Sequence, residues 1–339
     1  MNSNQFPFVT VNILAYNRKE EVDITLRKIL YNLEYPKDRY EVIVVDNAST
    51  DGTYEMIKTK YPEVKVIRLE KNIGIAGWNE GFKAGKGDYF LVLDDDAYIE
   101  GDTLLKLVNR AIKYNANLIS MRVVNPYSKE DFTELYPTGL LSFWGCSVLI
   151  DRKVIDTIGY YDENIFIWAH ELEYSIRLLN SGLIHCYSPD IIAYHMKQTI
   201  RDRDNDRIKL SHRMNFRHFF YISGKYFQGK YLFKSLFNLI TTALYINLKN
   251  FYRGVFNFRD VKQNVKDYII FYKKGRANRI KTHDVVQKAY LNSFIEFQNL
   301  LYRRYSNRFY LKNSKFYPNN GSYIIKFRKD NLDIIPINY

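Results

Sequence analysis

The chain has 339 residues, of which 46% are hydrophobic, so it is long enough for one large domain or two ordinary ones and is not a mostly disordered protein. Its net charge of +13 is unevenly divided. Residues 200–339 hold 28 Lys and Arg against 9 Asp and Glu, a net of +19, which leaves −6 for residues 1–199. An acidic first part joined to a basic, aromatic second part predicts two different tasks.

The first half of the chain alternates strand and helix patterns. Apolar runs of strand length predict strands at Phe8–Ala15, Tyr40–Val45, Val64–Leu69 and Tyr89–Leu93. The segments between them predict helices at Arg18–Leu33, Asp51–Lys60 and Gly77–Ala84. This alternation predicts an α/β fold with a mostly parallel sheet flanked by helices. Ala15–Asn17, Asp46–Asn47 and Asp94–Asp96 each follow a strand, so we expect them to converge on the rim where such sheets bind ligands.

The pattern is looser beyond Asp102. We expect a helix at Thr103–Tyr114, a strand at Leu118–Val124, a polar loop at Asn125–Thr138, a strand at Trp144–Ile150, a helix at Trp168–Ser181 and short strands at Leu183–Tyr187 and Ile191–His195. We divide the chain into an α/β domain at 1–205 and a basic, aromatic, largely helical region at 206–339.

The cysteines and the start of the chain indicate a compartment. Cys146 and Cys186 lack metal or redox spacing, and we expect both to be reduced core residues. The start, MNSNQFPFVTVNILAYN, leads directly into a strand, so we expect no secretory peptide. Both features predict a cytoplasmic protein.

Three adjacent aspartates, Asp94, Asp95 and Asp96, end a buried strand. Like charges this close repel one another, so some cation should compensate them. Mg2+ and Mn2+ accept carboxylate ligands, and a divalent metal site is therefore one interpretation. The alternative is a solvated strand end with a helix cap.

A glycine loop precedes the helix at Gly77–Ala84. The segment Asn72-Ile-Gly-Ile-Ala-Gly-Trp-Asn79 places Gly74 and Gly77 where a backbone can approach a ligand closely. Backbone N–H groups at the start of a helix favour an anion such as a diphosphate. Two glycines in a loop are common, so this motif has little specificity by itself.

Taken in order, several stretches resemble family 2 glycosyltransferases, in the group that includes bacterial rhamnosyltransferases and cell-surface polysaccharide enzymes. The stretches are VTVNILAYNR near the start, YEVIVVDNASTDGT at 40–53, NIGIAGWNEGFKAGKGDYFLVLDDDA at 72–97, WGCSVLIDRKVIDTIGYYDENIF at 144–166, HELEYSIRLLNSG from residue 170, and YH at 194–195. The resemblance covers roughly residues 6–200. It implies the glycosyltransferase-A fold, an α/β domain that binds a nucleotide-sugar.

The resemblance also implies roles for residues of the rim. It places the donor against Ala15, Tyr16, Asn17, Asp46, Asn72, Gly74, Gly77, Asn79, Asp94 and Asp95, with a UDP- or dTDP-sugar favoured. It implies that Asp46 contacts the base and that Mn2+ or Mg2+ is held by Asp96 with Asp94 and His195. Without the resemblance, a turn or cap carboxylate is the better interpretation of Asp46, and a surface histidine is as good an interpretation of His195 as a ligand.

Two residues depart from the family pattern. Trp78 stands where relatives often have Gly, and we expect it to reshape the donor pocket. Asp95 stands where relatives often lack an acid, and we expect it to be solvated if it does not contact the donor.

The base of an inverting transfer is implied at Glu171, near the start of the predicted helix at Trp168–Ser181. Glu173 is two residues further on and belongs to another face of the helix. Without the resemblance, an exposed residue in the first turn of a helix is the better interpretation of Glu171, and the resemblance reverses that preference. Trp144, Trp168 and His170 are weaker candidates for acceptor binding, and a core role is the alternative for the tryptophans.

The basic region between Ser211 and Leu248 mixes Lys and Arg with Phe and Tyr. Its longest nearly uncharged run, Ser235–Leu248, has 14 residues, which is too short to cross a membrane. Basic helices with aromatic residues suit the cytoplasmic face of an anionic membrane, where lipid-linked acceptors would be found. The alternative is a subdomain with its own core or an oligomer contact. We find no nucleic-acid motif and expect no nucleic-acid partner.

The sequence therefore predicts a membrane-associated inverting glycosyltransferase that moves a sugar from a nucleotide-diphosphate sugar to a glycan or lipid-linked saccharide. One rival is a nucleotidyltransferase that makes a nucleotide-sugar. The other is a non-catalytic polysaccharide- or membrane-binding protein on a transferase scaffold.

Overall fold

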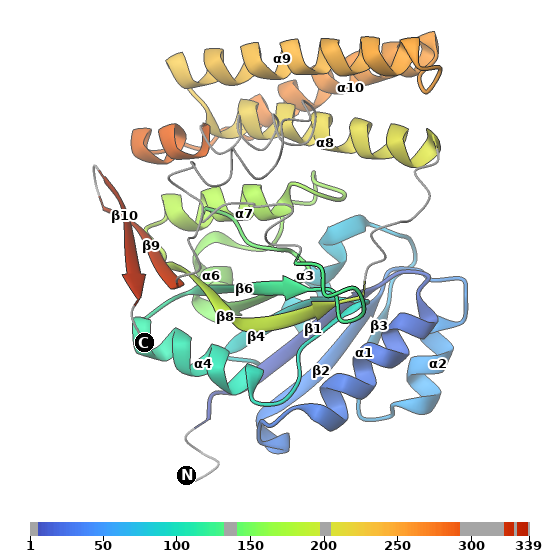
Figure 1. Ribbon diagram of the computed structural model, residues 1–339, viewed down its shortest axis with the longest axis vertical. Coiled ribbons are helices and arrows are strands. Elements are labelled where there is room, and N and C mark those ends of the chain that lie inside the picture. Colours follow the sequence, from blue (N-terminus) through green and yellow to red (C-terminus); the bar gives the residue numbers. More distant parts are fainter. Residues whose placement is uncertain (1–5, 132–140, 197–204, 292–321, 329–330, 338–339) are drawn as a thin grey trace.

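The computed structural model describes residues 6–131, 141–196, 205–291, 322–328 and 331–337 (Figure 1). Within these residues one mixed sheet contains β1 (Val9–Ala15), β2 (Tyr40–Asp46), β3 (Lys65–Arg68), β4 (Tyr89–Asp94), β5 (Ala97–Tyr98), β6 (Leu118–Val124), β7 (Ser147–Asp151), β8 (His185–His195), β9 (Ser322–Arg328) and β10 (Asn331–Ile337). The strand order is β10-β9-β8-β6-β7-β4-β1-β2-β3, and β5 pairs with β8. This confirms the predicted α/β fold class.

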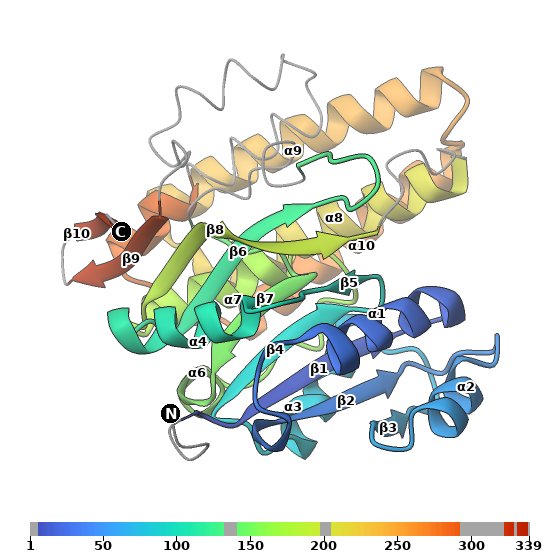
Figure 2. The same cartoon turned by 60° about the horizontal axis from the view of Figure 1, so that its bottom comes forward.

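Helices cover both faces of the sheet (Figures 1 and 2). One face packs against α1 (Lys19–Asn32), α2 (Thr53–Lys60) and α4 (Thr103–Tyr114) through one hydrophobic cluster. The other face packs against α3 (Trp78–Ala84), α6 (Arg152–Ile158) and α7 (His170–Asn180) through a second cluster. The helices α8 (Asn205–Tyr226), α9 (Gly229–Tyr252) and α10 (Phe258–Ala277) stack beyond α7, with α9 farthest from the sheet (Figure 1).

The parallel half of the sheet matches the prediction. β1 is parallel to both β2 and β4, with Ala15 opposite Asp46 and Leu14 opposite Asp94. Six of the seven β1 residues are buried, because helices cover the strand on both sides. The carboxyl ends of these three strands therefore meet at one rim, as expected.

The second half of the sheet is less regular than predicted. β7 lies between β4 and β6 and is antiparallel to both. The two short strands predicted at 183–187 and 191–195 are one strand, β8, interrupted by a bulge: Met121 pairs with Ser188, but Arg122 pairs with Ile192. Pro189 lies in this bulge, where its missing N–H costs no ladder bond. The polar loop is described at 125–131, and 132–138 lie outside the described residues.

The C-terminal region joins the rest of the molecule at two places. The second hydrophobic cluster combines sheet residues with Tyr221 and Tyr226 of α8 and Ile325 of β9. β9 is also antiparallel to β8, with Ile324 opposite Cys186. The predicted regions 1–205 and 206–339 therefore share a hydrophobic cluster and a sheet.

Two smaller expectations also have outcomes. Cys146 and Cys186 are buried and free, as predicted. Among the helices that the structure describes, none combines the length and the apolarity that crossing a membrane requires.

Candidate active site

The rim at the ends of β1, β2 and β4 is tied together by hydrogen bonds from the residues that follow these strands. The Asn47 N–H donates to the Ala15 carbonyl at 2.8 Å, and the Tyr16 N–H donates to Asp95 Oδ2 at 3.0 Å. The Asn17 N–H donates to Ser49 Oγ at 3.0 Å. The three polar segments that sequence patterns placed at one edge therefore lie in contact with one another.

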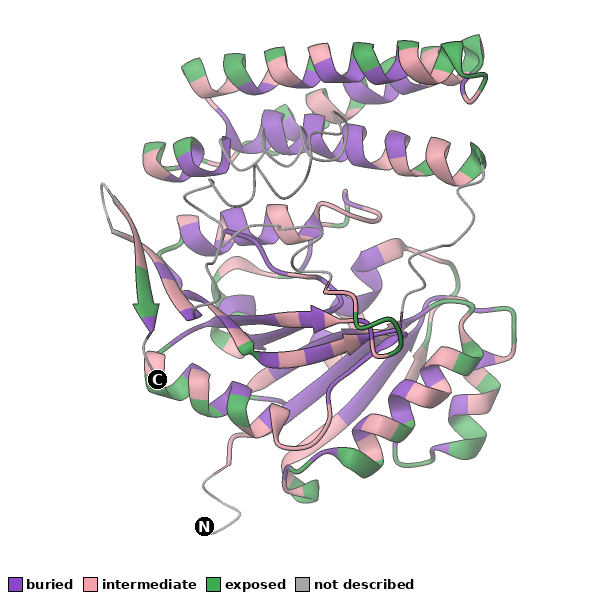
Figure 3. Ribbon diagram, in the orientation of Figure 1, coloured by how far each residue is buried: buried purple, intermediate pink, exposed green. Residues whose placement is uncertain are grey.

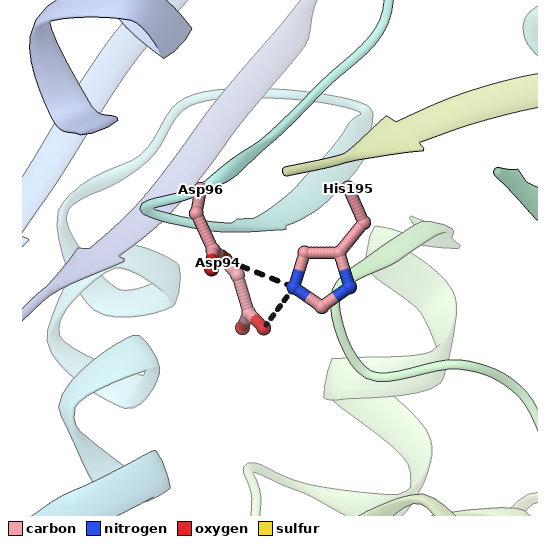
Figure 4. Close-up of side chains that lie close together, drawn as sticks. All are labelled: Asp94, Asp96 and His195. Carbon is pink, nitrogen blue, oxygen red and sulfur yellow. Dashed lines mark hydrogen bonds and ion pairs between the residues drawn. The ribbon is translucent and has the colours of Figure 1, made fainter. Parts of the chain in front are cut away.

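Asp94, Asp96 and His195 form a compact group at this rim (Figure 4). His195 Nε2 lies 2.9 Å from Asp96 Oδ1 and 3.8 Å from Asp94 Oδ2. His195 ends β8 and reaches the group because β8 pairs with β5, which follows the aspartates directly. One ligand atom from each of the three residues lies within 4.8 Å of the others. The two carboxylate oxygens suit Mn2+ or Mg2+, and the imidazole nitrogen is a possible further ligand for Mn2+. These residues therefore fit the metal that the fold implies.

Two cationic side chains compensate the three aspartates. Arg18 Nη1 forms an ion pair with Asp96 and another, at 3.2 Å, with Asp95 Oδ1. His195 pairs with the other oxygen of Asp96. The expectation that Asp95 is solvated is wrong: Asp95 is buried and is held by Arg18 and by the Tyr16 N–H. Asp94 is the most exposed of the three, with 35% of its side chain accessible.

The electrostatics of the pair between Asp96 and His195 favour the charged forms. Burial works against a charge on Asp96, but the hydrogen bond from His195 and the nearby Arg18 lower the pKa of Asp96 below its usual value. Burial also works against an imidazolium, yet Cys146 and Asp96 raise the pKa of His195 well above its usual value. Asp96 is therefore ionised at neutral pH, the state in which a carboxylate can bind a cation. A metal ion that also bound His195 Nε2 would have to displace the proton from this nitrogen, because an imidazolium has no lone pair there.

Asp46 occupies a fully buried position at the end of β2. Its Oδ1 accepts a hydrogen bond from the Ser49 N–H at 3.2 Å. Its Oδ2 lies 3.8 Å from Arg68 Nε and has no hydrogen bond to the described residues. A buried carboxylate oxygen with spare accepting capacity can receive a donor group from a ligand.

The glycines of the loop before α3 stand where there is little room for a Cβ atom. A Cβ on Gly74, at φ +68°, would lie 1.9 Å from the Phe166 carbonyl, and a Cβ on Gly77 would lie 2.4 Å from Leu14 Cδ1. Asn72 Oδ1 accepts from the Asn47 amide at 3.0 Å, which links the loop to the end of β2. Asn79 is buried and bonds the Tyr161 backbone through both ends of its amide. Asn79 therefore braces the loop, and its donor contact stays a prediction.

The start of α7 places Glu171 beside the loop that leads into β7. Glu171 Oε2 lies 3.2 Å from His170 Nδ1, and 21% of the Glu171 side chain is exposed. A Cβ on Gly145 would lie 2.9 Å from Glu171 Oε1 and 2.4 Å from His170 Nε2. The next residue, Cys146, accepts a hydrogen bond from the Asp94 N–H at 3.2 Å. Glu171 is therefore a partly exposed carboxylate close to the segment that contacts the aspartate group.

Glu173 has a different environment from Glu171. It is buried, and it bonds Arg177 Nη2 at 2.8 Å, Lys225 Nζ at 2.9 Å and the Tyr226 hydroxyl. Lys225 also bonds Asp162 Oδ2 at 2.5 Å. Burial works against the charge of Glu173, but Arg177 and Lys225 lower its pKa below the usual value. This network joins α7 to α8 and leaves Glu173 no free face.

The aromatic candidates lie in or near the core. Trp78 is buried, donates from Nε1 to the Leu93 carbonyl at 3.2 Å, and its ring centroid lies 5.8 Å from that of His170, while its effect on the donor pocket stays a prediction. His170 is buried against Trp78 and Tyr161, so it supports the start of α7. Trp144 and Trp168 are half-buried, and their acceptor role stays a prediction.

Sequence patterns missed Arg18, Gly145 and Lys225. Arg18 directly follows Asn17 at the rim and is the guanidinium that pairs with the aspartates. A signal for it was available, because three acids at a strand end require a cation and Arg18 follows the neighbouring strand. Lys225 had no comparable signal, because 52 residues separate it from Glu173.

The comparisons with known proteins agree with this geometry. Residues 10–158, which run from the second residue of β1 through β7 and include the aspartates, match the sequence profile of the family described as glycosyl transferase family 2. Residues 10–158 of this chain are a glycosyl transferase family 2 domain. His195 and Glu171 lie outside the matched residues, so the match does not bear on their roles.

Curated relatives and a solved structure are similar to this glycosyltransferase. A Methanococcus voltae protein, dolichyl N-acetyl-alpha-D-glucosaminyl phosphate 3-beta-D-2,3-diacetamido-2,3-dideoxy-beta-D-glucuronosyltransferase, is 25% identical over 57% of this chain and 68% of its own. An Escherichia coli protein, UDP-Glc:alpha-D-GlcNAc-diphosphoundecaprenol beta-1,3-glucosyltransferase WfaP, is 27% identical over 64% of this chain and 93% of its own. This chain spans about half or less of several other relatives.

The fold also has a solved counterpart. A mannosyltransferase from Pyrobaculum calidifontis, solved in complex with GDP-Man and Mn2+, superposes with a TM-score of 0.55 over 89% of each chain. The two sequences are 18% identical, so this likeness supports the glycosyltransferase-A fold alone.

Proposed function

We propose that this protein is an inverting glycosyltransferase that moves a sugar from a nucleotide-diphosphate sugar to a lipid-linked saccharide at the cytoplasmic face of a membrane. The use of a nucleotide-diphosphate sugar as donor is supported by the group of Asp94, Asp96 and His195 at the rim of a family 2 domain. The acceptor class is supported by the names of two relatives, one a dolichyl phosphate saccharide enzyme and the other a diphosphoundecaprenol saccharide enzyme.

The donor nucleotide would lie along the ends of β1 and β2. Asp46 Oδ2 is available to accept a hydrogen bond from the imide of a base, which favours a UDP- or dTDP-sugar. The diphosphate would then extend toward Asp94, past the loop of Asn72 and Gly74. A thermal-shift screen of UDP-, dTDP- and GDP-sugars tests this order of preference, because only a ligand that binds the folded state raises the melting temperature.

Asp94, Asp96 and His195 would hold a divalent cation, Mn2+ or Mg2+. Such an ion, when bound, stabilises negative charge on the leaving nucleoside diphosphate. The chain itself contributes an ionised Asp96 and the cation Arg18, which lies close enough to Asp96 to balance its charge when the donor is absent.

Glu171 would act as the general base that removes the proton from the acceptor hydroxyl. It lies in the first turn of α7, where the helix N-terminus stabilises an ionised carboxylate. Partial exposure leaves one side of the carboxylate available to an acceptor. His170 Nδ1 lies 3.2 Å from Glu171 Oε2, and the His170 ring is buried.

Replacing Asp96 by Asn is expected to abolish the metal-dependent part of donor binding. The amide keeps the shape of the side chain but loses the negative charge that a cation requires. The measurement is the thermal shift produced by a UDP-sugar with Mn2+, compared with the shift produced by the UDP-sugar and a chelator. The wild type should show a larger shift with Mn2+, and Asp96→Asn should show the same shift under both conditions.

The neighbouring variant Asp95→Asn is the control, because Asp95 binds Arg18 and the Tyr16 N–H but does not belong to the group with His195. It should keep its Mn2+-dependent shift. An Asp96→Asn protein that keeps a wild-type Mn2+ dependence would refute the metal assignment.

A further inference from the structure

The outer side of α9 carries a row of large apolar side chains that we name the α9 stripe. The stripe consists of Phe233, Phe237, Ile240, Leu244, Leu248 and Phe251. Their spacings of three and four residues place them on one side of the helix. All six are exposed, Phe233 to 71% and Phe237 to 63%, and exposed positions recur along α9 in Figure 3.

The opposite side of α9 is already used for packing. Leu239 and Ala243 are buried against Phe216 and Phe219 of α8 and Tyr268 of α10. The stripe is therefore a second apolar face and is not needed to hold α9 on the protein. Single exposed apolar residues are ordinary, but a contiguous row along a 24-residue helix marks an interaction surface.

The charge around the stripe is strongly positive. Residues 207–259 contain ten Lys and Arg and no Asp or Glu, and α9 itself contains Lys230, Lys234 and Lys249. Three of these ten cations are paired with acids: Lys225 is buried against Asp162 and Glu173, and two others pair with the acids of α10. Asp260 pairs with Lys209 at 3.2 Å and Asp267 pairs with Arg213, both on α8.

We infer that the α9 stripe is a membrane-binding face that lies in the plane of an anionic bilayer, with its apolar side chains among the acyl chains and its lysines at the headgroups. An apolar row flanked by lysines is the arrangement that binds such a surface. A two-fold dimer through the stripe is disfavoured, because the same patch from two copies would bring lysines together without acidic partners on α9.

This inference rests on the proposed function, because it identifies the surface by which the enzyme would bind the membrane. Vesicle binding can nevertheless be measured without donor or acceptor. Failure of vesicle binding and failure of sugar transfer are therefore separate results. A protein that binds vesicles and transfers no sugar would refute the proposed function and leave this inference standing.

The test is co-sedimentation of the full chain with two kinds of vesicles, one of phosphatidylcholine alone and one of equal parts phosphatidylcholine and phosphatidylglycerol. The wild type should bind the mixed vesicles far more strongly. The double variant Phe237→Ser/Leu244→Ser should bind them at least tenfold more weakly, since each large apolar side chain kept in water is worth about a factor of ten. The double variant Lys230→Gln/Lys234→Gln should lose part of its affinity and part of its salt dependence.

Ile112→Ser on α4 is the matched control, because Ile112 and Leu244 are both 57% exposed. It should bind vesicles as the wild type does, and the thermal melting temperature of each variant shows that it is folded. The inference is overturned if the wild type binds neither kind of vesicle or both equally. It is also overturned if the stripe variant keeps its vesicle affinity. A stripe variant that differs from the wild type only in the molar mass measured by light scattering would show an oligomer contact instead.

Discussion

Replacing Glu171 by Gln is expected to lower sugar transfer by about 10²–10⁴-fold while leaving donor binding nearly unchanged. Gln keeps the shape of the side chain and removes its ability to take a proton. The rate of transfer is measured in a product assay, and the affinity for the donor is measured in the absence of acceptor. Because Glu171 is partly exposed, the substitution should leave the stability of the fold within about 0.5 kcal/mol of the wild type.

Glu173→Gln separates a catalytic effect from a structural one. Glu173 is buried between Arg177 and Lys225, so the neutral amide should lower the free energy of unfolding rather than the rate constant of the folded enzyme. Sequence analysis placed Glu173 only on another face of the helix. The ion network explains why an acidic residue occupies this buried position. If Glu173→Gln is folded but inactive and Glu171→Gln transfers sugar normally, the base is Glu173.

Replacing Lys225 by Met is expected to lower the free energy of unfolding by about 3–5 kcal/mol, the usual cost of removing one partner from a buried ion pair. The Lys225 side chain is 8% exposed and bonds both Asp162 and Glu173. Met fills a similar volume but leaves one positive charge fewer for two buried carboxylates. The effect is measured by urea unfolding of the full chain at neutral pH.

Lys106→Met is the control, because Lys106 forms an exposed ion pair with Asp102 on α4. Such pairs contribute about 0–1 kcal/mol, so the control should change stability little. Equal losses in Lys225→Met and Lys106→Met would show that the buried network does not stabilise the protein.

The pH dependence of stability gives a second measure of the same network. Burial works against the charge of Asp162, but Lys225 lowers its pKa to about 2, and the pKa of Glu173 is also lowered. Both carboxyl groups have lower pKa values in the folded state than in the unfolded state. Their contribution is therefore complete above about pH 5 and is lost as the pH falls toward 2. The decrease in the free energy of unfolding on acidification should be smaller in Lys225→Met. Without the lysine, the two carboxylates already contribute less to stability at neutral pH.

Local sequence patterns were sufficient to predict the strands that form the rim of the sheet. The apolar runs of β1, β2 and β4 differ from the observed strands by at most one residue at an end. Parallel strands place their carboxyl ends together, so Asp46 and the three aspartates could be assigned to one site without coordinates. Resemblance to a family then supplied Glu171 and His195, which no periodicity indicates.

Contacts between distant parts of the chain could not be predicted. Nothing in the pattern of α7 indicates that Glu173 bonds a lysine on α8, and nothing near 322–328 indicates pairing with β8. Sequence patterns predict two short strands where the structure has the single strand β8, because a bulge with proline has the same local composition as a turn. Periodicity indicates whether a face is buried, but it does not indicate which residues cover it.

The pairing of β9 with β8 has a consequence for how the protein is made. Residues 196–321 separate the two strands, so a ribosome must add more than a hundred residues after β8 before its partner exists. During that time residues 185–187 of β8, which later pair with β9, present unpaired backbone groups, the kind of edge to which other nascent chains bind. Prematurely released chains that end before β9 would keep this edge open. Chaperone dependence during synthesis should therefore exceed what the stability of the finished fold suggests.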